Sequence, residues 1–217
     1  MVSHIKKILI TAGPTREAID PVRFLSNLST GEMGYAIARA AVQKKYQVTL
    51  VSGPTSLKPP RGVRFIPVVT AQELKKTCTE LFPKNDCLIM AAAVCDFQPR
   101  MPNRHKIPSN NGLVLKLKRT PDILRTMAKR KGRKMVIGFC LETRDLIRRA
   151  KTKLIQKNLD GMIANYYDFK THIPFGNRRV ETVFIDSSLK VLRVPKQSKR
   201  RIANHLLQWI GGLCRQS

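Results

Sequence analysis

The order of segments between residues 8 and 52 constrains the fold more than any other part of the chain. An apolar run, ILIT at residues 8–11, is followed by a small-residue turn, a polar loop, and a second turn containing Gly31 and Gly34. The pattern then predicts a helix over 33–44 and a buried strand over 47–52. Parallel strands need a crossover connection, so this order predicts a βαβ unit. Backbone amides at a helix N-terminus bind anions, and glycine lets a phosphate approach the backbone closely. The two turns therefore predict a phosphate site.

The rest of the chain continues this alternation. Apolar runs predict further strands over 63–69, 86–94, 135–140 and 161–165. Helices are predicted over 71–81, from about 120, over 145–157 and over 198–211, the first two with Thr70 and Thr120 as N-caps. A hairpin is predicted from 180–186 and 189–192. We therefore expect one α/β domain over residues 1–217: a three-layer, doubly wound, Rossmann-like parallel sheet with a small antiparallel β excursion.

Two further features bear on the site. Residues 96–111 show no periodicity and carry three prolines among basic side chains, which is typical of a functional loop. Residues 112–117 alternate like a half-exposed strand. In doubly wound sheets, ligands bind beyond the carboxyl ends of the strands. Asp96 follows a predicted buried strand, where a carboxylate is costly unless it is paired or metal-bound.

The composition of the chain bears on whether it binds nucleic acid. The 41 basic and 14 acidic residues give a net charge of +27, which first suggests nucleic acid. However, the basic residues are scattered and aromatic residues make up only 6%, with no stacking pattern. A basic nucleic-acid-binding module therefore stays as an alternative, although we expect no nucleic-acid partner.

The other alternative is an NAD(P)-dependent Rossmann oxidoreductase. The first turn, AGPT at residues 12–15, is not GxGxxG, and no acidic residue ends the second strand to hold a ribose. The five cysteines have no CxxC spacing, which favours a reducing cytoplasmic compartment. No apolar run approaches the roughly 20 residues of a membrane span, and no signal-peptide pattern precedes the first strand.

Several segments, in order along the chain, resemble one enzyme family. They are TAGPTRE (11–17), IDPVRF (19–24), SN (26–27), Gly31 with MG (33–34), AAAV (91–94) with DF (96–97), TPDI (120–123), GF (138–139) with ET (142–143), and residues 153–165. Together they resemble phosphopantothenate–cysteine ligase, also called phosphopantothenoylcysteine synthetase, of coenzyme A biosynthesis. The resemblance covers residues 8–165.

The resemblance implies a two-step ligase reaction. The carboxylate of 4′-phosphopantothenate attacks the α-phosphate of CTP, or of ATP, and releases pyrophosphate. L-Cysteine then attacks the acyl-nucleotide and gives 4′-phosphopantothenoyl-L-cysteine and CMP, with Mg²⁺ balancing the triphosphate charge. The resemblance further implies a homodimer formed through antiparallel strands at about 112–118 and 180–193. We expect a stand-alone cytoplasmic ligase without a membrane partner, with the decarboxylase of the same pathway encoded separately.

The resemblance also implies roles for individual residues. Asn27, Arg23 and Lys106 would be catalytic: Asn27 at the acyl-nucleotide, Arg23 as a clamp for a substrate anion, and Lys106 on a mobile flap over about 98–111. Asp96 would contact the nucleotide and is the candidate Mg²⁺ ligand. The implied nucleotide-binding residues are Gly13, Ser29, Gly31, Gly34, Ala92, Asp96, Lys106, Pro121, Asp122, Ile123, Leu124, Phe139, Lys153 and Lys157.

Four positions depart from the family pattern. The flap reads Lys106-Ile107-Pro108-Ser109, so the second and third lysines of the family's flap are missing. Glu32 stands where lysine is common, and Cys95 where alanine is usual. The first three changes remove positive charge near a polyphosphate and leave the choice between CTP and ATP open.

Overall fold

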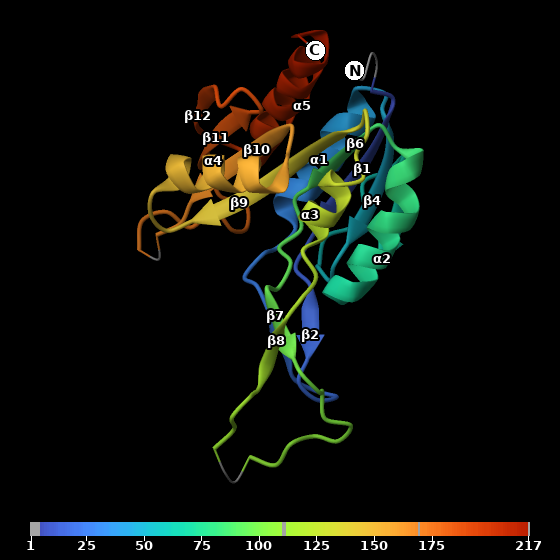
Figure 1. Cartoon of the computed structure of the whole chain (residues 1–217), viewed down its shortest axis with the longest axis vertical. Helices are drawn as coiled ribbons and strands as arrows, with labels where there is room; N and C mark the ends of the chain where they lie inside the picture. The colour runs from blue at the N-terminus through green and yellow to red at the C-terminus, as the bar shows by residue number, and fades with distance from the viewer. Residues whose placement is uncertain (1–4, 110–111, 169, 217) are drawn as a thin grey trace.

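A single eight-stranded sheet forms the centre of the molecule (Figure 1). The computed structural model describes residues 5–109, 112–168 and 170–216. Six strands of the sheet are parallel, in the order β5 (Val63–Pro67), β4 (Gln47–Ser52), β1 (Lys7–Ala12), β6 (Cys87–Met90), β9 (Met135–Glu142) and β10 (Gly161–Tyr166). The antiparallel strands β11 (Val180–Asp186) and β12 (Val191–Gln197) extend it beyond β10.

Helices cover both faces of this sheet. On one face, α1 (Glu32–Gln43) and α5 (Lys199–Gln216) pack together over a core that includes Ile10 and Phe184. On the other face lie α2 (Ala71–Leu81), α3 (Ile123–Ala128) and α4 (Leu146–Lys157), with the short 3-10 helix η1 (Phe82–Lys84) after α2. The predicted doubly wound, three-layer α/β fold is confirmed. None of the helices in the described ranges is long and apolar enough to cross a bilayer.

Two small antiparallel ribbons leave the carboxyl edge of the sheet. One pairs β2 (Arg16–Ala18) with β3 (Phe24–Ser26), and the other pairs β7 (Phe97–Pro99) with β8 (Leu117–Arg119). We call residues 16–26, 97–109 and 112–119 the arm. Figure 1 shows it projecting away from the body of the molecule, with the chain between β7 and β8 at its tip.

Several predicted boundaries were wrong. The strand predicted over 112–117 begins only at Leu117, and 112–116 have no regular structure. The helix predicted to begin with Thr120 as its N-cap begins at Ile123, because the Asp122 carboxylate accepts the Arg125 amide proton at 3.0 Å. The cap of α2 at Thr70 is as predicted. Of the predicted flap at 98–111, residues 110 and 111 lie outside the described residues.

Candidate active site

A cleft of about 870 Å³ opens at the carboxyl edge of the sheet. Its walls come from residues 26–28 after the β2–β3 ribbon, the chain after β6, residues 119–124 before α3, the end of β9, and α4. The predicted site residues that line it are Asn27, Ala92, Asp96, Pro121, Asp122, Ile123, Leu124, Phe139, Lys153 and Lys157. The fold thus brings together five segments that lie far apart in the sequence.

Small residues after β6 shape the floor of the cleft. The Ala92 amide donates to Thr11 Oγ1 at 3.1 Å, and the Ala93 amide donates to the Gly13 carbonyl at 2.9 Å. The chain after β6 is therefore tied to the chain that leaves β1, and methyl side chains leave the space above it open. Neighbouring parallel strands that end at one edge explain this proximity.

Asn27 is held at this floor by its amide group. Its Nδ2 donates to the Ala93 carbonyl at 3.1 Å and to the Val94 carbonyl at 3.0 Å. A side-chain amide has two N–H donors, so both are engaged here. To donate to a developing oxyanion, as we expect, Asn27 would exchange one of these bonds for the substrate.

The two cleft lysines are each paired with an acid. Lys157 Nζ lies 2.9 Å from Asp122 Oδ2, and Lys153 Nζ lies 2.6 Å from Glu142 Oε1. Glu142 is buried and also accepts from Arg149 Nε at 2.5 Å. Burial would raise the pKa of Glu142, but the hydrogen bonds and charges of Lys153 and Arg149 outweigh it and lower this pKa. Glu142 therefore stays ionised and positions two cations beside the cleft.

Asp96 lies in the cleft but is exposed, six residues beyond the end of β6. The expectation that it ends a buried strand was wrong, because the strand stops at Met90 and the chain turns toward the arm. No three His, Cys, Asp or Glu side chains gather into a metal site within the described ranges. A lone exposed carboxylate fits Mg²⁺ that is shared with substrate phosphates, because Mg²⁺ is usually held by one or two carboxylates plus the nucleotide.

Cys140 lines the cleft and forms part of its wall. Burial, as the largest effect, raises the pKa of Cys140 to about 12. The thiol therefore stays protonated at neutral pH and is a poor nucleophile.

The turns that contain Gly13, Gly31 and Gly34 lie beside the cleft, and these three glycines do not line it. A Cβ at Gly34 would come within 2.5 Å of Ala12 Cβ, so this glycine lets α1 approach β1. Gly13 and Gly31 adopt left-handed backbone angles, with φ of 70° and 81°. Ser29 Oγ accepts the Gly31 amide at 3.3 Å. These contacts explain the glycines by packing, and their predicted role in phosphate binding stays a prediction.

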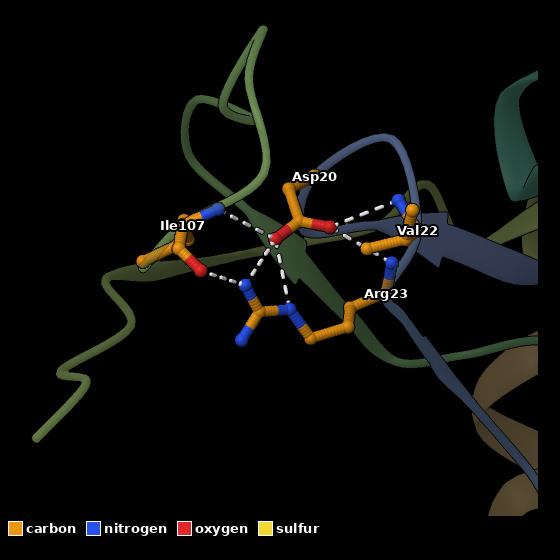
Figure 2. A network of polar contacts seen from close by, with 4 residues as sticks. All are labelled: Asp20, Val22, Arg23 and Ile107. Carbon is orange, nitrogen blue, oxygen red and sulfur yellow. Dashed lines mark hydrogen bonds and ion pairs between the residues drawn. The ribbon is translucent and has the colours of Figure 1, made fainter. Parts of the chain in front are cut away.

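The two remaining predicted catalytic residues, Arg23 and Lys106, lie in the arm. Arg23 is bound to Asp20, with its Nε 2.8 Å from Oδ2, and its Nη2 donates to the Ile107 carbonyl (Figure 2). Asp20 also accepts the amide protons of Val22, Arg23 and Ile107. Lys106 is exposed. Neither Arg23 nor Lys106 lines the cleft, so in this structure Arg23 holds the arm together.

Asp20 is the centre of this network, with its side chain fully shielded from solvent. Burial alone would raise its pKa, but the hydrogen bonds from Val22, Ile107 and Arg23 outweigh burial and lower it from 3.8 to about 2. Figure 2 shows how a single carboxylate joins the turn after β2 to the irregular chain at Ile107, between β7 and β8.

Sequence reasoning missed several cleft residues. Arg119, Tyr167 and Phe175 line the cleft, the last two with ring centroids 5.7 Å apart. Both rings come from the irregular chain after β10, where no periodicity marks them. Arg149, which binds Glu142 beside the cleft, was missed as well, although the family pattern had already marked Glu142 itself.

Comparisons with known proteins agree with this architecture. A family model described as "DNA/pantothenate metabolism flavoprotein C-terminal domain" matches residues 3–213. The chain is 43% identical over 216 residues to the coenzyme A biosynthesis bifunctional protein CoaBC of Bacillus subtilis (strain 168), an alignment covering 98% of this chain and 52% of that protein. The chain thus spans about half the length of the curated relatives it matches.

Solved structures show the same fold. The crystal structure of the C-terminal domain of a CoaBC protein superposes with a TM-score of 0.83 at 36% identity, covering 98% of this chain and 97% of that one. The DNA/pantothenate metabolism flavoprotein from Streptococcus pneumoniae superposes with a TM-score of 0.81 at 27% identity, covering 96% and 99%.

Proposed function

The chain belongs to the family of DNA/pantothenate metabolism flavoprotein C-terminal domains, and we propose from this that it is a phosphopantothenate–cysteine ligase. The observation that carries the proposal is the cleft itself. It gathers, at the carboxyl edge of a doubly wound sheet, nine of the fourteen residues that the ligase resemblance assigns to a nucleotide, from four separate segments, together with Asn27 from a fifth. A cleft of about 870 Å³ has the size of a small-molecule site.

The proposed reaction has two steps. A carboxylate oxygen of 4′-phosphopantothenate attacks the α-phosphorus of CTP or ATP, and the bond to the bridging oxygen breaks and releases pyrophosphate. The amine of L-cysteine then attacks the acyl carbon and loses a proton, and the nucleoside monophosphate leaves. Holding both reactants in one cleft lowers the entropic cost of each step.

The cleft residues have distinct proposed tasks. Lys153 and Lys157 would move from Glu142 and Asp122 toward the incoming polyphosphate, so the acids keep the lysines ordered before the nucleotide binds. Asn27, which lies at the floor of the cleft, would orient the activated carboxyl group. Asp96 would hold Mg²⁺, which balances phosphate charge.

The arm gives the proposal a further requirement. Lys106 is exposed on the arm, so to act on the nucleotide it must approach a cleft that it does not line here. We propose that the chain works as a cytoplasmic homodimer in which the arm closes over a nucleotide-loaded cleft. Sedimentation of the protein with and without nucleotide tests the dimer: a single species with the mass of one chain at micromolar concentration would contradict it.

A product assay tests the activity directly. The protein is incubated with 4′-phosphopantothenate, L-cysteine, Mg²⁺ and either CTP or ATP, and products are followed by mass spectrometry. We expect phosphopantothenoylcysteine, pyrophosphate and the matching nucleoside monophosphate in equal amounts. No turnover with either nucleotide would overturn the proposal.

A variant tests the role of Asn27. Asn27→Asp removes both N–H donors from the cleft floor, and we expect the acyl-nucleotide to accumulate while pyrophosphate release continues. If pyrophosphate release and amide formation fall together, Asn27 has another role.

A further inference from the structure

A second cavity, of about 630 Å³, lies on the other side of the chain that follows β10. Leu146 at the start of α4 lines one side, and Ile173 and Pro174 line another. Val180 and Val183 of β11 are both buried and also line it. Its volume falls within the range of small-molecule sites, and these side chains give it apolar walls.

Cationic side chains surround these walls. Arg178 and Arg179 precede β11, and Arg193 and Lys196 lie on β12. Among the described residues that line the cavity, the one acid is Glu181. Its Oε1 is 4.0 Å from Arg193 Nη1, and both side chains are largely exposed. Such a loose exposed pair contributes little, so the cavity keeps a strong excess of positive charge.

The cavity is separate from the candidate active site, although the two share a wall. Tyr166 lines the cavity and Tyr167 lines the cleft, because successive side chains leave the end of β10 in opposite directions. Each ring packs on a ring from the following loop: Tyr166 on His172 at 5.6 Å, and Tyr167 on Phe175 at 5.7 Å.

From the apolar walls and the four cations, we infer that this cavity is a second ligand site, for an organic anion that joins an apolar body to a phosphate or carboxylate head. The body would lie against Ile173, Val180 and Leu146, and the head would face Arg178 and Arg193. A polyanion without an apolar part would leave the walls unfilled.

Calorimetry with octyl phosphate tests this inference. Inorganic phosphate, which represents the anionic head alone, and octanol, which represents the apolar body alone, are the controls. We expect one octyl phosphate per chain, bound more tightly than either part. Arg193→Glu should weaken binding about tenfold or more, the size expected when one charged hydrogen bond is lost. Ile173→Trp, which fills the cavity without changing its charge, should also weaken binding.

The net charge of +27 calls for a matched control. Arg64 is exposed on β5, the opposite edge strand of the same sheet, so Arg64→Glu makes the same charge change away from the cavity. Arg64→Glu should leave octyl phosphate binding within about twofold of the wild type, because only distant screened charge is lost. Melting temperatures check that all variants are folded.

Three results would overturn the inference. The first is an equal loss in Arg193→Glu and Arg64→Glu, which would show attraction by overall charge. The second is binding that survives Arg193→Glu but is lost in Lys157→Met, which would place the ligand in the active-site cleft. The third is no binding of octyl phosphate, or binding no tighter than that of inorganic phosphate.

Discussion

The cleft and the arm leave the same edge of the sheet but are held in place differently. The cleft is built on the ends of β1 and β6, which a hydrogen bond from Ala92 to Thr11 joins, and Gly34 lets α1 pack closely on the end of β1. The arm depends on two short ribbons and on the Asp20 network, with exposed apolar residues such as Met101 and Val114 along it. Packing therefore gives the cleft one geometry, whereas the position of the arm depends on a few polar contacts.

The largest effect should be a loss of stability when a side chain is added at Gly34, where α1 packs on β1 beside the cleft. Gly34→Val places side-chain atoms against Ala12 and the Thr11 carbonyl, where a Cβ alone would be 2.5 Å from Ala12 Cβ and 3.0 Å from the Thr11 oxygen. We expect a loss of about 3 kcal/mol in unfolding free energy and a melting temperature roughly 6–12 °C lower. Gly112→Val in the arm, where nothing lies within 4 Å of an added Cβ, is the control. Similar melting temperatures for the two variants would contradict the packing account.

The second largest effect is on nucleotide affinity, which should depend more on side chains in the cleft than on side chains in the arm. Lys157→Met removes a cation that lines the cleft, so the dissociation constant for the accepted nucleotide should rise about tenfold or more. Lys151→Met on the same helix, outside the cleft lining, should change it less than about threefold, whereas Lys106→Met in the arm should raise it by an intermediate amount, because Lys106 meets the nucleotide only after the arm closes. Calorimetry with CTP and ATP measures this. An equal loss in Lys151→Met would show that overall charge holds the nucleotide, and no loss in Lys106→Met would contradict closure of the arm over the cleft.

Removing the arm's anchor should have a local effect. Asp20→Asn leaves one acceptor oxygen and turns N–H groups toward the donors of Arg23 and Ile107, so the arm should detach. We expect cleavage within the arm by a dilute protease to be roughly tenfold faster, as local opening governs the rate. Asp86→Asn, which disturbs a carboxylate that accepts two amides at the opposite end of β1, is the control and should not speed cleavage in the arm.

The smallest effect is the pH dependence of the same anchor. The pKa of Asp20 is about 2 in the folded protein against an ordinary value of 3.8, so its stabilisation of the arm is complete above about pH 4. It is lost as the pH falls from about 4 through 2, when the carboxyl group binds a proton. The Ile107 amide and Arg23 Nε proton resonances should shift together in this window. A shared midpoint near pH 4 would contradict the lowered pKa.

The positions of the parallel strands along the chain could be predicted because they follow from local patterns. Apolar runs marked the six parallel strands, and the rule that ligands bind beyond their carboxyl ends predicted the edge of the sheet at which the cleft opens. Asn27, Asp122 and Phe139, which line this cleft, were assigned by the family resemblance. The cap of α3 could not be placed, since Thr120 and Asp122 both suit an N-cap and only tertiary contacts select Asp122.

The arm shows where sequence reasoning stops. Arg23 was predicted to meet substrate, but the buried Asp20 three residues earlier binds it, and neither periodicity nor spacing reports such a partner. Asp96 was expected at a buried strand end, whereas the chain leaves the sheet at Met90. Tyr167 and Phe175 come from irregular chain, for which local patterns predict no geometry.

The account's central claim, that the cleft activates a carboxylate with a nucleotide, is tested most directly by leaving out L-cysteine. The protein would be mixed with 4′-phosphopantothenate, Mg²⁺ and CTP or ATP, and pyrophosphate release would be followed over one turnover. We predict a burst of about one pyrophosphate per active site that requires phosphopantothenate and becomes continuous when L-cysteine is added. Release that is absent with both nucleotides, or independent of phosphopantothenate, would contradict the claim.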